Sequence, residues 1–182
     1  GLVLMGQSAD NIEVVGSVGV TVLGEAGDDH LMGGDGNDTI DGGDGSDFIY
    51  GADGADALAG GTGADFIDGG FGSDFIDGGE GGDDLSGGDG SDTLTGGTGS
   101  DVIDGGYGHD VAVFAGHQSD YTFASSVDGL TVTVTDRGTG DVDTVTNVET
   151  LSFADGDIAV SHDGAGLVLM GQSADNIEVV GS

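Results

Sequence analysis

Residues 33–77 read GGDGNDTID GGDGSDFIY GADGADALA GGTGADFID GGFGSDFID, which are five consecutive units of nine residues. The same period extends outward from this stretch to Gly24 and to Val113, so that ten units follow one another without interruption. All ten units have Gly at positions 1 and 4 and Asp at position 6, while Gly occupies position 2 in eight and Leu or Ile occupies position 8 in nine. Repetition at a fixed short period is typical of a solenoid, in which each repeat buries its apolar side chain against its neighbours.

Each position of the repeat predicts a local conformation. Glycines at positions 1, 2 and 4 permit positive φ and close backbone approach, so positions 1 to 6 are expected to form a tight turn. Positions 7 to 9 are expected to form a short strand whose middle side chain points inward. Two repeats then complete one coil, and position 8 forms two inner columns. The first column is Leu31, Ile49, Ile67, Leu85 and Ile103, and the second is Ile40, Leu58, Ile76, Leu94 and Ala112.

Stacking of the coils also places the aspartates of position 6 above one another. Neighbouring strands are about 4.8 Å apart, and two unit charges about 5 Å apart repel each other by about 3 kcal/mol at an effective dielectric constant of about 20. Such columns would destabilise the fold unless a counterion neutralised them. Carboxylates and turn carbonyls are hard oxygen ligands, which suit Ca²⁺ because this ion accepts about six to eight oxygens in a flexible geometry.

The repeat GGxGxDxUx, in which U is aliphatic, resembles that of the RTX (hemolysin-type) calcium-binding nonapeptide-repeat proteins over residues 24–113. The resemblance implies an all-β fold, namely a parallel β-roll (RTX solenoid) with a C-terminal antiparallel β-sheet cap. It implies Ca²⁺ ions shared between the Asp side chains and turn carbonyls of adjacent coils. The implied ligands are Asp29, Asp38, Asp47, Asp56, Asp65, Asp74, Asp83, Asp92, Asp101 and Asp110. One ion between each repeat and the next but one gives about eight Ca²⁺ per unit, which would change the formal charge from -34 to about -18.

Composition excludes several classes of function. The chain has 182 residues with 35 acidic side chains, one basic side chain (Arg137), no Cys and no Pro, and its formal net charge is -34. Nucleic acid is excluded as a partner, because no basic surface could replace the counterions of phosphate. Membrane insertion is not expected, since no apolar run approaches the roughly 20 residues that span a bilayer. The motifs HExxH and GxSxG are absent, as is Lys, so no catalytic or cofactor-binding residues are assigned and no enzyme is expected.

Outside the ten repeats the pattern changes, which suggests a division into 1–23 (degenerate coil), 24–113 (roll), 114–165 (sheet cap) and 166–182. Strands are expected at 111–115, 121–124, 130–135, 148–153 and 158–160, where β-branched and aromatic residues alternate with polar ones. The stretches DYTF, LTVTVTD and DTVTNVETLSFADG resemble the sheet that commonly follows RTX rolls. Packing explains the aromatic residues of this sheet more simply than carbohydrate binding does.

The two ends of the chain have the same sequence. Residues 1–17, GLVLMGQSADNIEVVGS, recur letter for letter as residues 166–182, at an offset of 165 residues. Such identity indicates recent duplication, engineering, or a window cut from a tandem array, and we favour the array. Asp10 then belongs to a degenerate coil with one insertion, because it precedes Asp29 by 19 residues, and Asp175 plays the same part in the next unit. The expected partners are neighbouring identical units arranged head-to-tail.

The remaining side chains of interest are assigned to the surface. The histidines His30, His109, His117 and His162 are expected to be surface residues. Phe48, Tyr50 and Phe66 lie at outward positions and predict an exposed aromatic ladder, which would serve either as an interaction surface or as stacking between strands. Arg137 is expected to be a loop cation that pairs with a nearby Asp.

These patterns favour a Ca²⁺-dependent structural repeat unit of an extracellular bacterial assembly, such as a filament, a surface layer or an adhesin stalk. The family resemblance implies type I-like export to the medium or cell surface, with folding on Ca²⁺ binding after secretion. Two alternatives remain open at this point. One is an RTX secretion and folding module of a secreted enzyme, and the other is a Ca²⁺-dependent module that binds a cell-surface polysaccharide.

Overall fold

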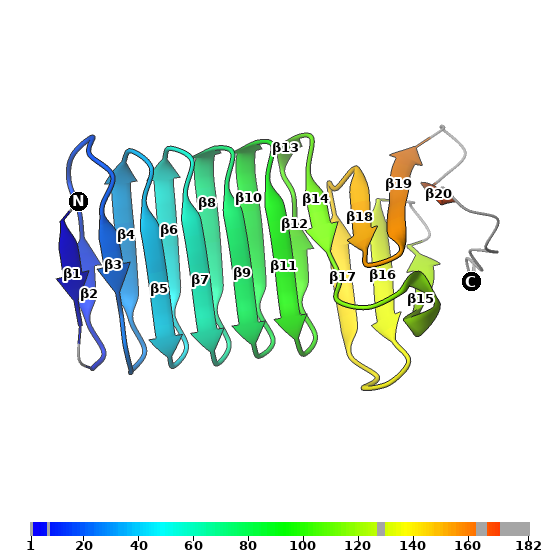
Figure 1. The fold of residues 1–182 in the computed structure, drawn as a ribbon, viewed down its shortest axis with the longest axis horizontal. Helices are drawn as coiled ribbons and strands as arrows, with labels where there is room; N and C mark the ends of the chain where they lie inside the picture. Colours follow the sequence, from blue (N-terminus) through cyan, green and yellow to red (C-terminus); the bar gives the residue numbers. More distant parts are fainter. Residues whose placement is uncertain (1, 7, 127–129, 163–166, 172–182) are drawn as a thin grey trace.

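The computed structural model describes residues 2–6, 8–126, 130–162 and 167–171, in which the strands form two facing sheets wound as a solenoid (Figure 1). The first sheet contains, in spatial order, β1 (Val3–Met5), β3 (Thr21–Leu23), β5 (Thr39–Asp44), β7 (Ala57–Thr62), β9 (Phe75–Glu80), β11 (Thr93–Thr98), β14 (Val111–Val113), β18 (Thr150–Phe153), β19 (Gly156–His162) and β20 (Leu167–Gly171). The second sheet contains β15 (Tyr121–Ser125), β16 (Thr131–Asp136), β17 (Val142–Thr146), β12 (Val102–Asp104), β10 (Asp84–Gly90), β8 (Phe66–Gly72), β6 (Phe48–Asp53), β4 (His30–Asp35) and β2 (Asn11–Glu13), with β13 (Tyr107–Gly108) beside β10.

The strands of the ten repeats are parallel and stack in the register that the sequence period predicts. In the first sheet Ile40 is paired with Leu58, and in the second sheet Ile49 is paired with Ile67. Each pair is two repeats apart, so one coil contains one strand of each sheet. The predicted parallel β-roll is therefore confirmed.

The core of the roll consists of the two predicted inner columns. Side chains at position 8 are between 0% and 3% exposed. Because each coil contributes only two such side chains, no coil has a core of its own, and the stack must fold as an array. The N-terminal strands extend both columns, since Ile12 pairs with Leu31 and Val22 pairs with Ile40.

The strands are longer than predicted. They run from position 7 of one repeat to position 3 of the next, so that β5 has six residues and only positions 4 to 6 form the turn. The glycines at positions 1 and 2 stay within the ladder because their backbone groups bond to neighbouring coils: Gly24 N–H donates to the Asp41 carbonyl at 2.7 Å, and Gly43 is paired with Gly61. Positive φ at position 2 therefore bends the strand without ending it.

In spatial order, each sheet gains one further parallel strand beyond the roll and then continues with antiparallel strands. Strand β17, which the sequence pattern did not predict, pairs in parallel with β12 and antiparallel with β16. Strand β18 likewise pairs in parallel with β14 and antiparallel with β19. The predicted strands at 111–115, 121–124, 130–135, 148–153 and 158–160 correspond to β14, β15, β16, β18 and β19. The short polar sequence of β17, VDTVT, becomes a strand because two partners lie beside it.

Aromatic side chains form the core of the cap. Phe114, Tyr121, Phe123 and Phe153 are between 5% and 8% exposed, and their ring centroids lie 5.3–5.8 Å from those of their neighbours. Packing thus accounts for these aromatic residues, as predicted. The cap also contains a single 3-10 turn, η1 (Gln118–Asp120), and no helix of the described part of the chain is long and apolar enough to cross a membrane. Residues 172–182, including Asp175, lie outside the described residues.

A glycine-to-alanine pair tests the steric basis of the stack. Gly72, at position 4, has φ +140°, and a Cβ at this residue would overlap the carbonyl oxygen of Gly54 in the preceding coil. At Gly82, at position 5, φ lies outside the left-handed region and the nearest atom to a Cβ would be Ser100 O at 3.3 Å. We expect Gly72→Ala to lower the free energy of unfolding by about 1–3 kcal/mol. Gly82→Ala should change it by less than about 0.5 kcal/mol. Urea unfolding in saturating Ca²⁺ measures both, and equal midpoints would contradict this account of the turn.

Candidate metal centre

The aspartates of position 6 are buried although they carry charge. All ten, from Asp29 to Asp110, are between 0% and 3% exposed. The 18-residue coil separates them into two columns. Column one contains Asp29, Asp47, Asp65, Asp83 and Asp101, and column two contains Asp38, Asp56, Asp74, Asp92 and Asp110.

One carboxylate oxygen of each aspartate is used to hold adjacent coils together. Oδ1 of Asp65 accepts the backbone N–H of Asp47 at 2.8 Å, and Oδ1 of Asp74 accepts that of Asp56 at 2.8 Å. The same bond to the preceding coil recurs for all ten residues, at distances between 2.5 and 2.9 Å. This contact fixes the orientation of the carboxylate and leaves its other oxygen for a different partner.

The second carboxylate oxygen has no such partner. Within the described residues, Oδ2 of every one of the ten aspartates is buried and accepts no hydrogen bond. Buried polar atoms are nearly always paired, and an unpaired ionised carboxylate away from water is costly. Ten such oxygen atoms in two regular columns are suited to a cation as their common partner.

Glycine at position 1 lets two oxygen atoms approach its backbone closely. A Cβ built on Gly42 would overlap Asp47 Oδ2 and lie 2.6 Å from the carbonyl oxygen of Gly60 in the next coil. The same two oxygens, one carboxylate and one glycine carbonyl, converge beside position 1 in the repeats that begin at Gly24, Gly33, Gly42, Gly51, Gly60, Gly69, Gly78 and Gly87. Carboxylate and carbonyl oxygens are the donors that Ca²⁺ prefers, so the residues present fit this ion.

The carboxylates do not gather into larger clusters. Among the residues that the structure describes, no group of three or more His, Asp or Glu side chains is placed to hold a metal ion. A cation in the columns would therefore be bound by a few carboxylates together with backbone carbonyls. This mixed donor set again suits Ca²⁺ rather than Zn²⁺, which is bound mainly by Cys and His.

Burial raises the pKa of nine of these aspartates. The pKa rises from 3.8 to about 6 for Asp47, Asp56, Asp74, Asp83 and Asp110, mainly because the carboxylate loses hydration. The hydrogen bond from the preceding coil opposes the rise, whereas neighbouring carboxylates of the column add to it. Without a cation, these five carboxyl groups would therefore take up protons as the pH falls towards about 6, well above the usual range for Asp.

Both columns extend beyond the ten repeats. The sequence analysis placed Asp10 in a degenerate coil before the roll but missed the acids that extend the columns at the C-terminal end. At the C-terminal end, Oδ1 of Asp143 accepts the backbone N–H of Asp101 at 3.0 Å, and Oε2 of Glu149 accepts that of Asp110 at 2.8 Å. At the N-terminal end, a Cβ on Gly6 would overlap Asp10 Oδ2 and lie 2.9 Å from the Gly24 carbonyl, the arrangement found inside the roll. Each added acid stands two residues before an aliphatic core residue, as Asp does in the repeat. This acid-x-aliphatic triplet is the signal that could have identified them.

A residue of the cap also replaces the glycine carbonyl at the end of column two. The carbonyl oxygen of Asn147 would overlap a Cβ built on Gly105, beside Asp110 Oδ2, where a glycine carbonyl lies in the other repeats. Asn147 has a positive φ of 50°, and its side-chain amide donates to Asp104 Oδ1 at 2.7 Å, which holds the turn in place. The first member of column two differs, because Val20 occupies the aspartate position and supplies only its N–H to Asp38.

Comparison with known families agrees with this geometry. The model of the RTX calcium-binding nonapeptide repeat (4 copies) matches residues 23–58, 50–85 and 86–113, which together make up half of the chain. The chain belongs to the RTX calcium-binding repeat family. RTX nonapeptide repeats bind calcium in general, and the columns of this RTX roll have the donors for it.

Other comparisons add little. A search of curated protein sequences finds no match. Among solved structures the RTX chain is similar to the crystal structure of the extracellular lipase LipA from Serratia marcescens, with 23% identity, 68% of this chain and 19% of the lipase chain covered, and a TM-score of 0.34. The chain thus spans about a fifth of that lipase's length, and a likeness at this TM-score carries no argument about function.

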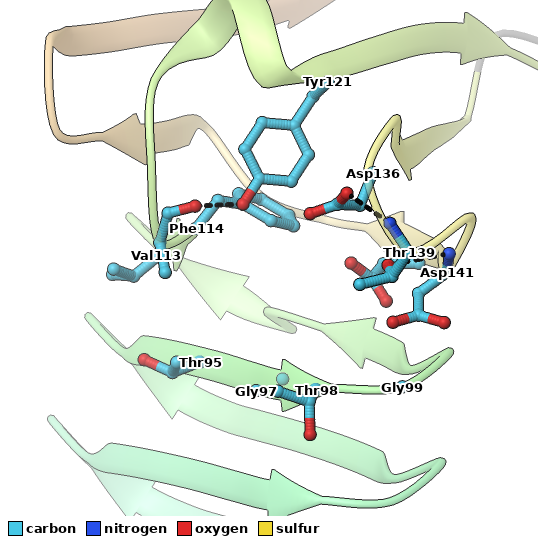
Figure 2. A pocket seen from close by; sticks show the side chains of 13 residues that line it. Thr95, Gly97, Thr98, Gly99, Val113, Phe114, Tyr121, Asp136, Thr139 and Asp141 are labelled. Atoms are coloured by element: carbon cyan, nitrogen blue, oxygen red, sulfur yellow. Dashed lines mark hydrogen bonds between the residues drawn. The ribbon is translucent and has the colours of Figure 1, made fainter.

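A small pocket of about 170 Å³ lies where the last coils of the RTX roll meet the cap (Figure 2). Its polar groups are engaged within the protein: Asp136 Oδ1 accepts the N–H groups of Gly138 and Thr139, and the Tyr121 hydroxyl donates to the Ala115 carbonyl. The pocket also borders Asp143, whose pKa burial raises to about 6. These contacts indicate a structural junction rather than a ligand site.

The predicted surface residues are placed as follows. His30, His109 and His117 are exposed, as predicted, while the side chain of His162 lies outside the described residues. The ring contacts of the aromatic ladder are confirmed and include His30: ring centroids are 6.4 Å apart for His30–Phe48, 5.5 Å for His30–Tyr50, 6.0 Å for Phe48–Phe66 and 5.8 Å for Tyr50–Phe66. The predicted exposure holds only for Phe48, because Tyr50 and Phe66 are half-buried. The prediction for Arg137 was wrong in its partner. Its Nε donates to the Tyr121 carbonyl at 3.1 Å, because the turn after β16 lies against the start of β15.

The raised pKa values predict how the calcium-free RTX roll responds to pH. A carboxyl whose pKa is higher in the folded state contributes stability that is present below its unfolded pKa of 3.8 and is lost as the pH rises through about 6. In calcium-depleted buffer we therefore expect the β signal in circular dichroism to increase as the pH falls from 7 towards 4.5. Sedimentation must show that the material stays dispersed, since the pI is about 4.1. A β signal that is unchanged or smaller at low pH would contradict the prediction.

Proposed function

We propose that this chain is a calcium-folded structural repeat unit of an extracellular bacterial assembly, such as a filament, a surface layer or an adhesin stalk. The observation that supports this most directly is the set of ten buried, unpaired Oδ2 atoms in two stacked columns. Without cations, each column combines costly desolvation with repulsion between like charges. Cation binding would therefore supply folding free energy, as it does in other small metal-dependent domains.

The proposed ligands are the ten position-6 aspartates together with the position-1 glycine carbonyls. About eight Ca²⁺ would bind within the nonapeptide repeats. Asp10, Asp143 and Glu149 continue the columns and are proposed to bind further ions at the two ends, with Asn147 supplying its carbonyl at one of them. Calcium would supply positive charge and flexible oxygen coordination at these places, and the protein would supply a fixed spacing of oxygens.

The metal dependence suggests when folding takes place. In a cytosol poor in Ca²⁺ the columns would keep the chain unfolded and suited to export, in keeping with the type I-like route implied by the family. Outside the cell, millimolar Ca²⁺ would fill sites with dissociation constants of about 10⁻⁴–10⁻³ M. Calcium would thus act as the signal that restricts folding to the extracellular space.

The assembly role is supported by the ends of the chain. Residues 1–17 and 166–182 are identical, which favours a tandem array of 165-residue units. We propose neighbouring identical units as the main partners, with a cell-surface polysaccharide as a further one. The proposed role is structural rather than catalytic.

The first test compares the chain in Ca²⁺, in Mg²⁺ and in chelator. We expect a disordered far-UV circular dichroism spectrum in chelator, a full β spectrum in millimolar Ca²⁺, and no comparable recovery in Mg²⁺, which demands a stricter octahedron than these oxygens offer. Negative-stain electron microscopy of the native material should show extended polymers in Ca²⁺ that come apart in chelator. Full β structure in excess chelator would contradict calcium-dependent folding. Compact single particles in both conditions would favour a module that serves an enzyme.

A second test distinguishes specific binding of Ca²⁺ by the aspartate columns from a general effect of negative charge. Asp83 and Asp84 are adjacent, but Asp83 is 2% exposed with an unpaired Oδ2, whereas Asp84 is exposed. Asp83→Asn and Asp84→Asn remove the same charge from the same strand region. We expect Asp83→Asn to raise the Ca²⁺ concentration at the folding midpoint by about tenfold, equivalent to about 1.4 kcal/mol, and to lower the number of ions bound in calorimetry.

The outcome for the neighbouring residue is the control. Asp84→Asn should leave the midpoint and the ion count close to those of the unchanged chain, because its carboxylate faces solvent. Equal effects of the two substitutions would indicate that Ca²⁺ acts only as a diffuse counterion, and would overturn the assignment of the columns as ligands.

A further inference from the structure

The same five residues occupy both ends of the first sheet. The sequence LVLMG occurs as Leu2–Gly6 and again as Leu167–Gly171. The first copy contains β1, which pairs in parallel with β3, whereas the second copy is β20, which pairs antiparallel with β19. Figure 1 shows the two strands at opposite ends of the long axis of the molecule.

The first copy bonds through one of its two edges. The N–H of Thr21 donates to the Leu2 carbonyl at 2.9 Å, and the N–H of Gly6 donates to the Leu23 carbonyl at 2.8 Å. Successive residues of a strand direct their N–H and C=O groups to opposite sides. Residues 2, 4 and 6 therefore face β3, and the backbone groups of Val3 and Met5 face the open end of the sheet.

The second copy bonds through the other edge. The N–H of Val160 donates to the Glu149 carbonyl at 2.8 Å, so Val160 faces β18, and the adjacent residues Ala159 and Ser161 face β20. In the antiparallel register, these two residues lie opposite Met170 and Val168. Val168 and Met170 thus bond to β19, while the backbone groups of 167, 169 and 171 point away from it.

The two edges are complementary. Residues 168 and 170 of the second copy correspond to residues 3 and 5 of the first. In β1, the backbone groups of residues 3 and 5 have no strand partner among the described residues. Residues 167, 169 and 171 correspond to residues 2, 4 and 6, whose backbone groups face β3 in the first copy. One copy of LVLMG could therefore form both sets of bonds at once, without a change of register.

We propose that a single LVLMG strand is shared at each junction of the tandem array, as the last strand of one unit and the first strand of the next. On one side it pairs antiparallel with β19, and on the other it pairs in parallel with Thr21–Leu23 of the next copy of the unit. This inference rests on the proposed tandem function and specifies its interface. Residues 172–182 repeat the sequence of residues 7–17, which form most of the connection from β1 to β3 in the first copy.

The shared strand has a mechanical consequence. The first sheet would run through the junction without a linker, so neighbouring units would form one continuous rod rather than beads on a string. It also removes an exposed strand edge at every junction, and such edges promote unspecific pairing. The first sheet would then have free strand edges only at the two ends of the array.

Amide hydrogen exchange tests the junction directly. The single unit (residues 1–182) is compared with a two-unit chain in which residues 1–165 precede a complete copy of 1–182, both in saturating Ca²⁺. In the single unit we expect protection of the amides of Val168 and Met170, and rapid exchange at Leu169 and Gly171. In the two-unit chain, the amides of Leu169 and Gly171 at the junction should be slowed at least about a hundredfold.

A proline pair provides the matched variants, because proline removes one N–H and is tolerated where that group has no ladder partner. Leu169→Pro should leave the single unit unchanged in thermal stability but abolish the junction protection in the two-unit chain. Met170→Pro should disturb the pairing with β19 in both chains. Rapid exchange at Leu169 and Gly171 in a two-unit chain whose rolls are folded by circular dichroism would overturn the shared strand. Absence of calcium-dependent folding would instead reject the proposed function.

Discussion

The position-6 aspartate in each coil is the constraint on which the rest of this structure depends. Stacking coils at the spacing of a β-sheet places one buried carboxylate directly above the next, and each carboxylate uses Oδ1 to hold the N–H of the coil before it. The hydrogen bond to Oδ1 that holds adjacent coils together therefore also fixes the position of the carboxylates, whose mutual repulsion opposes the stacking. Glycine at position 1 lets Oδ2 and a glycine carbonyl of the next coil come close together, and glycines at positions 2 and 4 have the positive φ that the turns require. A solenoid built in this way needs a cation with several oxygen ligands.

The cap solves the problem of where the columns end. A roll that stopped at Val113 would leave Asp101 and Asp110 without the carboxylate that each inner member receives from the following coil. Strands β17 and β18 supply it through Asp143 and Glu149, and they continue both sheets in parallel before β16 and β19 turn them antiparallel. The aromatic core of Phe114, Tyr121, Phe123 and Phe153 then replaces the thin aliphatic columns. The cap thus supplies the last carboxylates of both columns and also contains an aromatic core.

A parallel stack of coils can always accept a further strand at its edge, and this property connects the fold to the proposed tandem assembly. Among the described residues, β1 and β2 are the outermost strands on the N-terminal side of their sheets, and the first sheet ends on its other side in a strand that contains the sequence of β1. Calcium would decide whether the coils form, while strand pairing would decide how units join. The formal charge of -34 favours separation of chains before calcium is bound and keeps unneutralised surfaces apart afterwards.

Sequence alone determined the parts of this protein that repeat. A nine-residue period with invariant Gly and Asp specifies parallel coils, the two aliphatic columns and the two aspartate columns, because every coil presents the same local information to its neighbour. Tertiary structure decided the rest. Strands β15 and β16 interrupt the period, so that Asp143 and Glu149 reach the columns across 42 and 39 residues, and no spacing rule connects them to Asp101 and Asp110. The length of the strands, the identity of β17 and the partner of Arg137 were decided in the same way, since each depends on which backbone groups lie beside a segment once distant parts of the chain have met.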